Sequence, residues 1–257
     1  MTRIAFGIEY DGTDFLGWQS QTQQPTLQDT VSAALSFVAG EKLTLVCAGR
    51  TDTGVHARCQ VVHCDTEAQR TARAWVLGGN SRLPPAVCIR WAHVVDDAFH
   101  ARFSAQSRAY RYCIVNRPVR LALEARFATW ERVPLDVAAM QSACIVLLGT
   151  QDFSSFRTSA CQARSPVRTI TALDWHRDGE EVTLRIAGNG FLHHMVRNIV
   201  GSALRVGRGD AGVAWIAEVL SATDRNRAGP TAPPEGLLFE GPRYPAYFGL
   251  PAESTLA

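Results

Sequence analysis

The chain of 257 residues contains a single lysine, Lys42, so arginine carries almost all of its positive charge. Arginine suits planar, two-pronged contacts with phosphate or carboxylate groups, although drift in genome composition also produces such a bias. The formal net charge is only +2, so bulk charge gives no argument for a nucleic-acid partner. No segment approaches the roughly 18 apolar residues that span a bilayer, and no signal-type run opens the chain. We therefore expect a cytoplasmic protein without a membrane partner.

Sequence motifs for cofactors and metals are also missing. There is no Walker loop, no Rossmann glycine fingerprint and no nucleophile elbow, so no nucleotide cofactor is expected. His193 and His194 are adjacent and lack the H-E-x-x-H spacing of zinc sites. On a helix their side chains would point about 100° apart, which disfavours joint ligation of one ion. We expect neither a cofactor nor a metal site.

The seven cysteines include no C-x-x-C pair, and their number is odd. Several alternate with valine or isoleucine, which is typical of buried strands. Reduced, buried thiols in a cytosolic protein are the interpretation that this pattern favours, and a metal or disulfide role is the alternative.

Hydrophobic periodicity predicts a mixture of strands and helices. Thr26 is the expected N-cap of a helix that ends at Gly40. The strands are expected near residues 4–10, 43–48, 58–65, 87–95, 108–116, 167–177 and 181–188, and the other helices near 67–77, 135–148, 191–206 and 212–221. Because strict β-α-β alternation is absent, the class is α+β, with two similar-sized α/β subdomains and mixed, mainly antiparallel sheets. The predicted subdomains cover residues 1–106 and 107–257.

The arginines gather in acid-free stretches. Five lie between residues 102 and 120, three lie with two histidines between 190 and 209, and Arg157, Arg164 and Arg168 form a third group. Such segregation indicates a basic cleft for a polyanion between the subdomains, and solvated faces with local ion pairs are the alternative. In the predicted strand around Arg111, Tyr110 and Tyr112 face one way, which suits base stacking or a core position.

One short segment has the composition of a site. In residues 49–57, G-R-T-D-T-G-V-H-A, Asp52 lies in a glycine-bracketed turn, two residues after Arg50 and four before His56. The D-T-G triplet also occurs in aspartic proteases, which need two such aspartates sharing a proton. This chain has only one, and Arg50 opposes proton sharing.

The same segment resembles the G-R-T-D-A-G-V-H-A motif of the TruA family of tRNA pseudouridine synthases, with Thr53 where alanine is usual. Six further blocks resemble the family in order: residues 10–13 (Y-D-G), 15–19 (F-x-G-W-Q), 99–105 (F-H-A-R-F-S-A), 108–112 (R-x-Y-x-Y), 191–201 (F-L-x-H-M-V-R-N-I-V-G) and 232–237 (A-P-x-x-G-L). The resemblance therefore runs almost from end to end.

The resemblance implies a homodimeric isomerase that converts uridine to pseudouridine at positions 38, 39 and 40 of the tRNA anticodon stem-loop. Asp52 would be the catalytic nucleophile on a flipped-out uridine, and Tyr110 would lie on that base. Arg197 would be the ion-pair partner of Asp52, and Arg50 would help to hold the open RNA. Arg102 and His56 would contact RNA or brace the loop. A non-catalytic tRNA-binding protein and, more remotely, an aspartic protease are the rival interpretations.

Overall fold

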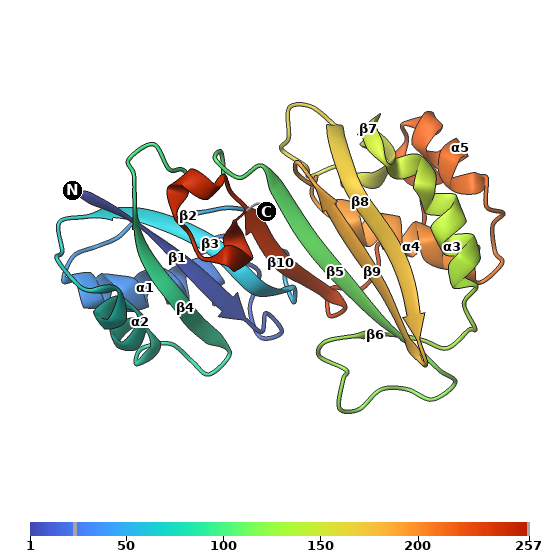
Figure 1. The fold of residues 1–257 in the computed structure, drawn as a ribbon. Coiled ribbons are helices and arrows are strands. Elements are labelled where there is room, and N and C mark those ends of the chain that lie inside the picture. Colours follow the sequence, from blue (N-terminus) through green and yellow to red (C-terminus); the bar gives the residue numbers. More distant parts are fainter. Residues whose placement is uncertain (23–24, 256–257) are drawn as a thin grey trace. The chain divides into compact units, whose positions relative to one another are not determined.

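The computed structural model describes residues 1–22 and 25–255, and the chain forms two compact units. The first unit consists of Met1–Ser107 and Leu238–Ala257, and the second of Arg108–Leu237. Each unit combines helices with a mixed, mainly antiparallel sheet (Figure 1). The predicted α+β class is confirmed.

The first unit is organised around a sheet with the order β4–β1–β3–β10. β1 (Thr2–Tyr10) pairs antiparallel with both β3 (His56–Thr66) and β4 (Val87–Val95), and the short β2 (Val46–Cys47) pairs antiparallel with β3. β10 (Leu237–Arg243) runs parallel to β3, with Leu238 opposite His56. The start of β3, where the Asp52 loop ends, is therefore held on two sides.

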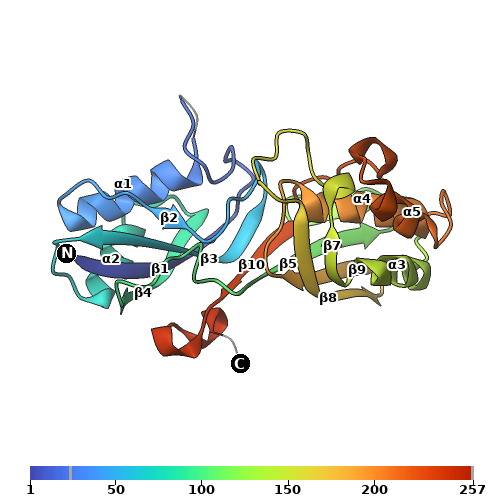
Figure 2. The ribbon, with the colours of Figure 1, turned by 90° about the horizontal axis from the view of Figure 1, so that it is seen from above.

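Helices and the C-terminal segment cover the sheet of the first unit. Figure 2 shows α1 (Leu27–Ala39) on one side and the C-terminal segment on the other. α1 begins at its N-cap Thr26, whose hydroxyl accepts the Asp29 N–H, and ends at Gly40 in the left-handed conformation, as predicted. α2 (Ala72–Asn80) packs on the sheet through Trp75, which makes an edge-to-face contact with Phe6 at 5.5 Å. The C-terminal segment carries the 3₁₀ turns η4 (Ala246–Phe248) and η5 (Ala252–Ser254).

The C-terminal segment differs from the predicted division of the chain. The second subdomain was predicted to cover residues 107–257, whereas Leu238–Ala257 belongs to the first unit. The physical reason is that β10 pairs with β3 and that Tyr244 and Phe248 pack on Phe99, with ring centroids 5.0 and 5.1 Å away. A pairing between distant segments leaves no periodic signal in either segment.

The second unit has the strand order β5–β9–β8–β7. β5 (Ser107–Asn116), β9 (Glu181–Gly188), β8 (Val167–Asp178) and β7 (Gly149–Asp152) pair antiparallel, and β6 (Thr129–Glu131) lies parallel to β5. α3 (Val137–Cys144), α4 (Met195–Gly207) and α5 (Trp215–Ala222) pack together. The 3₁₀ turns η1 (Ile145–Leu147), η2 (Ser154–Phe156) and η3 (Arg225–Arg227) pack in the same group.

Several predicted elements have different bounds. α4 begins at Met195 rather than near residue 191, because His194 precedes it with a φ of 62° in the left-handed region. The two histidines therefore lie in the turn before the helix. The predicted strand 43–48 shortens to β2, and the predicted helix 67–77 begins only after its N-cap Thr71. β6, β7 and β10 were not predicted, because each depends on pairing with a distant strand.

Candidate active site

Asp52 lies in the loop that connects β2 to β3 in the first unit. Its side chain is half-buried, and its neighbours Arg50 and Thr53 are exposed. The turn closes through the Val55 N–H, which donates to the Asp52 carbonyl at 3.2 Å. Gly54 has a φ of 76°, a conformation that glycine adopts without strain. The loop thus holds one carboxylate at the surface directly before a buried strand.

The backbone around Asp52 is tied to the segment that follows β1. The Trp18 N–H donates to the Thr51 carbonyl at 3.0 Å, and the Gly54 N–H donates to the Phe15 carbonyl at 3.4 Å. The hydroxyls of Tyr10 and Thr51 form a buried hydrogen bond of 2.8 Å. These contacts fix Thr51 and Gly54, which lie on either side of Asp52, so the backbone that carries its carboxylate is held in place.

Two glycines allow that segment to approach the loop closely. Gly17 has a φ of 80°, and a Cβ there would lie 2.7 Å from the Thr51 carbonyl oxygen. A Cβ on Gly12 would lie 2.0 Å from the Val55 carbonyl oxygen. Both distances are far shorter than normal contacts, so any side chain would displace the loop. The sequence motifs contained both glycines but did not indicate that they support Asp52.

Gln60 anchors the beginning of the loop from inside β3. Its side chain is fully buried, and its amide donates to the Gly49 carbonyl while its oxygen accepts the Gly49 N–H at 3.4 Å. Gln60 is not among the site residues predicted from the sequence. The signal was present, because a polar side chain within an apolar strand requires a buried partner.

His56 is only 3% exposed. Its Nδ1 accepts the Gly12 N–H at 3.1 Å, and Asp11 Oδ1 lies 3.2 Å from the same nitrogen. Burial and these contacts favour the bracing role, which was one of the two roles expected for His56.

Arg50 and Arg102 place positive charge beside the loop. Both lie close enough to Cys47 for their charges to lower its pKa, although burial dominates and raises that pKa to about 11. Arg102 is exposed, and its guanidinium lies over the ring of Phe103 at 5.6 Å. Its backbone N–H donates to His100 Nδ1 at 3.2 Å, which fixes the turn. The first unit therefore presents two arginines near the segment that carries Asp52.

In the second unit, the two tyrosines of β5 have different environments. Tyr112 is fully buried, and its hydroxyl contacts the Thr129 hydroxyl at 2.7 Å and donates to the Pro233 carbonyl at 2.8 Å. Burial raises the Tyr112 pKa well above its usual range. Tyr110 is half-buried and meets Phe191 edge-to-face at 5.1 Å. Tyr112 is therefore a core residue, and Tyr110 retains an accessible part.

Arg197 occupies the first turn of α4 and is half-buried. Its Nε donates to the Ala232 carbonyl at 2.7 Å, and the Ala232 N–H donates back to the Arg197 carbonyl at 3.1 Å. The segment after Ala232 also accepts the Tyr112 hydroxyl through Pro233, so the guanidinium is held by a well-connected part of the second unit. Asp52 belongs to the first unit, and Tyr110 and Arg197 belong to the second.

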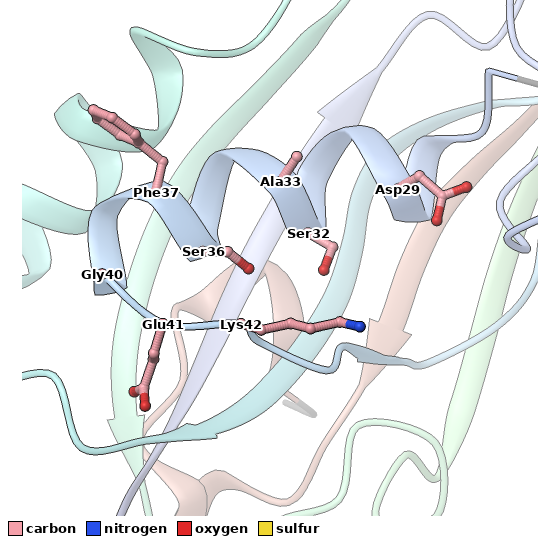
Figure 3. Close-up of a pocket in the computed structure, with 8 residues that line it drawn as sticks. All are labelled: Asp29, Ser32, Ala33, Ser36, Phe37, Gly40, Glu41 and Lys42. Atoms are coloured by element: carbon pink, nitrogen blue, oxygen red, sulfur yellow. The ribbon is translucent and has the colours of Figure 1, made fainter.

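A pocket of about 640 Å³ lies beside α1 and contains none of the predicted site residues (Figure 3). In Figure 3, Ser32 and Ser36 point toward the segment that carries Lys42. Their hydroxyls are used by Leu43: Ser32 donates to its carbonyl and Ser36 accepts its N–H, both at 2.9 Å. These polar groups serve to fasten the connection after α1 rather than to receive a ligand.

The cysteines are only partly as expected. All seven are free thiols, but Cys88 is exposed, and only Cys59, Cys64 and Cys144 are buried. Burial raises the pKa of Cys59 to about 11 and that of Cys64 and Cys144 to about 12.

No helix in residues 1–22 and 25–255 is long and apolar enough to cross a membrane.

Comparisons with known proteins agree on one family. A sequence profile described as tRNA pseudouridine synthase matches residues 7–104 and 143–245. The chain belongs to the tRNA pseudouridine synthase family. This is a family of isomerases, and the TruA resemblance drawn from the motifs is confirmed. The protease interpretation has no support from any of these matches.

Relatives named tRNA pseudouridine synthase A match along the whole chain. The protein of Xanthomonas campestris pv. campestris (strain B100) is 52% identical over 98% of this chain and 99% of its own length. The protein of Stenotrophomonas maltophilia (strain K279a) is 52% identical over 99% of this chain and 100% of its own length. The protein of Xylella fastidiosa (strain M12) is 51% identical over the full length of both chains. Among solved structures, an archaeal box H/ACA sRNP Nop10–Cbf5 complex matches at 13% identity and a TM-score of 0.35, over 78% of this chain and 44% of that chain, which is too weak to support a conclusion.

Proposed function

We propose that Asp52 is the nucleophile of a tRNA pseudouridine synthase that acts on uridines 38, 39 and 40 of the anticodon stem-loop. The observation that carries the proposal is the support of Asp52, a half-buried carboxylate whose backbone is held by Trp18 and by close approaches at two glycines. A purely structural loop does not require an exposed arginine and a supported carboxylate together. Preorganisation of this kind is what nucleophilic catalysis requires.

The reaction needs no external reactant. The N1–C1′ bond of uridine breaks, the base turns, and a C5–C1′ bond forms, while C5 loses a proton and N1 gains one. Atoms and electrons balance, so one carboxylate that stabilises the detached sugar or base is sufficient in principle. Thr53, the departure from the family motif, is exposed, so its hydroxyl does not disturb the buried support of the loop.

The remaining residues act on the RNA or on the carboxylate in this proposal. Arg197 is the ion-pair partner of Asp52, and the bond from its Nε to Ala232 supports this role by fixing the guanidinium. Tyr110 packs on the flipped base, a role supported by its accessible ring. Arg50 and Arg102 contact the phosphate backbone, supported by their exposure. His56 braces the turn after β1.

The substrate must leave its stacked position before reaction. A uridine in a stem is paired, and flipping it out costs a few kcal/mol. Exposed arginines beside the loop compensate part of this cost through contacts to the opened strand. We further propose that the enzyme is a cytoplasmic homodimer with a tRNA bound by both subunits.

The experiment is to incubate the purified protein with unmodified tRNA and to map pseudouridine by mass spectrometry of nuclease fragments. The expected result is multiple turnovers, with pseudouridine confined to positions 38, 39 and 40. Modification at other positions would refute the anticodon assignment. Tight binding without turnover would favour the rival, a non-catalytic tRNA-binding protein.

A further inference from the structure

A second cavity of about 640 Å³ lies entirely within the second unit. Its walls come from η2 and the residues that follow it, from the turn before α4, and from η3 and the residues that follow it. The lining contains two arginines, Arg157 and Arg225, together with His194, and it contains no carboxylate. A cavity of that composition attracts an anion.

One of the two arginines builds the wall. Arg225 donates to the Gly229 carbonyl at 2.9 Å and to Asn198 Oδ1 and the Thr231 hydroxyl, both at 3.1 Å. Asn198 is fully buried in α4 and also donates to the Phe156 carbonyl at 2.7 Å. The wall is thus rigid before any ligand arrives, which lowers the ordering cost of binding.

The other arginine is not used by the fold. Arg157 is half-buried and lines the cavity, and within the described part of the chain its side chain makes no hydrogen bond or ion pair. Its backbone N–H donates to the Ser154 carbonyl at 3.4 Å, so the main chain is placed by η2. The sequence had singled out Arg157 within the third arginine group, and nothing in the proposed catalytic site explains it.

The neighbouring groups suit a phosphate. Thr158 and Ser159 contribute hydroxyls to the same lining, and hydroxyl groups and arginine are the usual side-chain donors to backbone phosphates of nucleic acids. The guanidinium fork matches two phosphate oxygens. The volume also leaves room for a flanking ribose.

We propose that this cavity binds a backbone phosphate of the tRNA substrate, with Arg157 as the principal ligand. The inference rests on the proposed function only in taking tRNA as the substrate. It concerns RNA affinity rather than the chemical step, so the contact is sequence-independent. Loss of Arg157 then raises KM for tRNA and leaves kcat at saturating tRNA unchanged.

The test compares wild type with Arg157→Gln in tRNA-binding titrations over a range of salt concentrations. A lost phosphate contact reduces the slope of log K against log salt concentration by about 0.7 to 0.9. At low salt the affinity falls by about ten- to a hundredfold, as expected for a charged hydrogen-bonded contact. Arg157→Lys retains the wild-type slope with an intermediate affinity, because the charge remains but the fork is lost.

The matched control is Arg132→Gln, which removes the same charge from an exposed residue of the second unit outside the cavity. It leaves the slope and KM at wild-type values. Equal effects of the two substitutions would overturn the proposal, because net charge alone would then explain them. Unchanged tRNA binding in Arg157→Gln would also overturn the phosphate-site proposal. If wild type still makes pseudouridine in that case, the proposed function is unaffected.

Inorganic phosphate distinguishes a free anion from RNA as the occupant. If phosphate raises the melting temperature of wild type but not of Arg157→Gln while both bind tRNA equally, the cavity takes a free anion and the RNA assignment is wrong. If wild type forms no pseudouridine in any tRNA, the proposed function fails, whatever the binding results.

Discussion

Tyr110 and Tyr112 show how single residues of one strand divide between core and site. Strand alternation puts both on the same face, but Tyr112 is fully buried and donates to the Pro233 carbonyl, while Tyr110 is only half-buried. The sequence predicted the shared face and left open which tyrosine was in the core. That choice depends on segment 232–237, which is distant in sequence.

Substitutions at these two tyrosines therefore have different effects. Tyr112→Phe leaves a buried carbonyl and a hydroxyl without their partner and lowers the free energy of unfolding by about 1–3 kcal/mol, with kcat retained. Tyr110→Leu removes the ring that we propose packs on the flipped base, and we expect it to lower turnover by about ten- to a hundredfold. Denaturant unfolding and single-turnover kinetics measure the two effects. A stable but inactive Tyr112→Phe would show that the roles are reversed.

His63 gives the first unit a pH-dependent stability. Burial, with smaller contributions from the charges of His100 and Arg3, lowers the His63 pKa from 6.5 to about 4. In the unfolded chain His63 therefore becomes protonated near pH 6.5, whereas in the folded protein it stays neutral until the pH approaches about 4. Stability is fully present above pH 6.5 and declines as the pH falls through about 4, by up to about 3 kcal/mol.

The matched variant for this prediction is His63→Asn, which keeps an acceptor near the Ala101 N–H that His63 Nδ1 accepts at 3.1 Å. Urea denaturation between pH 6.5 and 4 should show a shallower loss of stability in the variant than in wild type. Parallel curves would mean that His63 does not titrate in this way.

At the scale of secondary-structure elements, the capped helix α1 and the long strands were predictable, whereas the short strands β6, β7 and β10 were not. α1 matched its prediction because its Thr26 cap and Gly40 end are set by adjacent residues. α4 began late because the left-handed His194 interrupts an apolar pattern that itself continues through residues 191–206. The Asp52 loop was recognisable as a motif, but its support by Gln60 and Gly17 depends on contacts with other segments of the first unit.

Gly17 tests whether that support matters. Gly17→Ala combines left-handed strain with a Cβ at 2.7 Å from the Thr51 carbonyl oxygen. We expect a loss of about 2–4 kcal/mol in the free energy of unfolding and a larger fall in kcat than in tRNA affinity.

The control is Gly40→Ala, because Gly40 has a similar φ of 76° and no atom within 4 Å of the added Cβ. Gly40→Ala introduces only the backbone strain, so we expect it to lower the free energy of unfolding by about 1–2 kcal/mol and to keep full activity. If both variants lose activity in proportion to stability, close packing against the Asp52 loop has no specific role.

At the scale of the whole molecule, the chain forms its first unit from both ends of the sequence. The sequence predicted two similar-sized parts and the boundary near residue 106, but not the return of Leu238–Ala257 to the first unit. The family was recognisable because its motifs are distributed along the entire chain, and the relatives match over nearly all of it. The near-neutral net charge gave no indication of a polyanion partner, whereas the separation of arginines from acids along the sequence did.

Asp52→Asn provides the most direct test of the proposed chemistry. The measurement is tritium release from tRNA labelled at uridine C5, with tRNA affinity determined on the same preparations and the exposed Asp97→Asn as the control. The account predicts that Asp52→Asn folds, binds tRNA like wild type and releases no tritium, while Asp97→Asn is fully active. Tritium release by Asp52→Asn at the wild-type rate would contradict it.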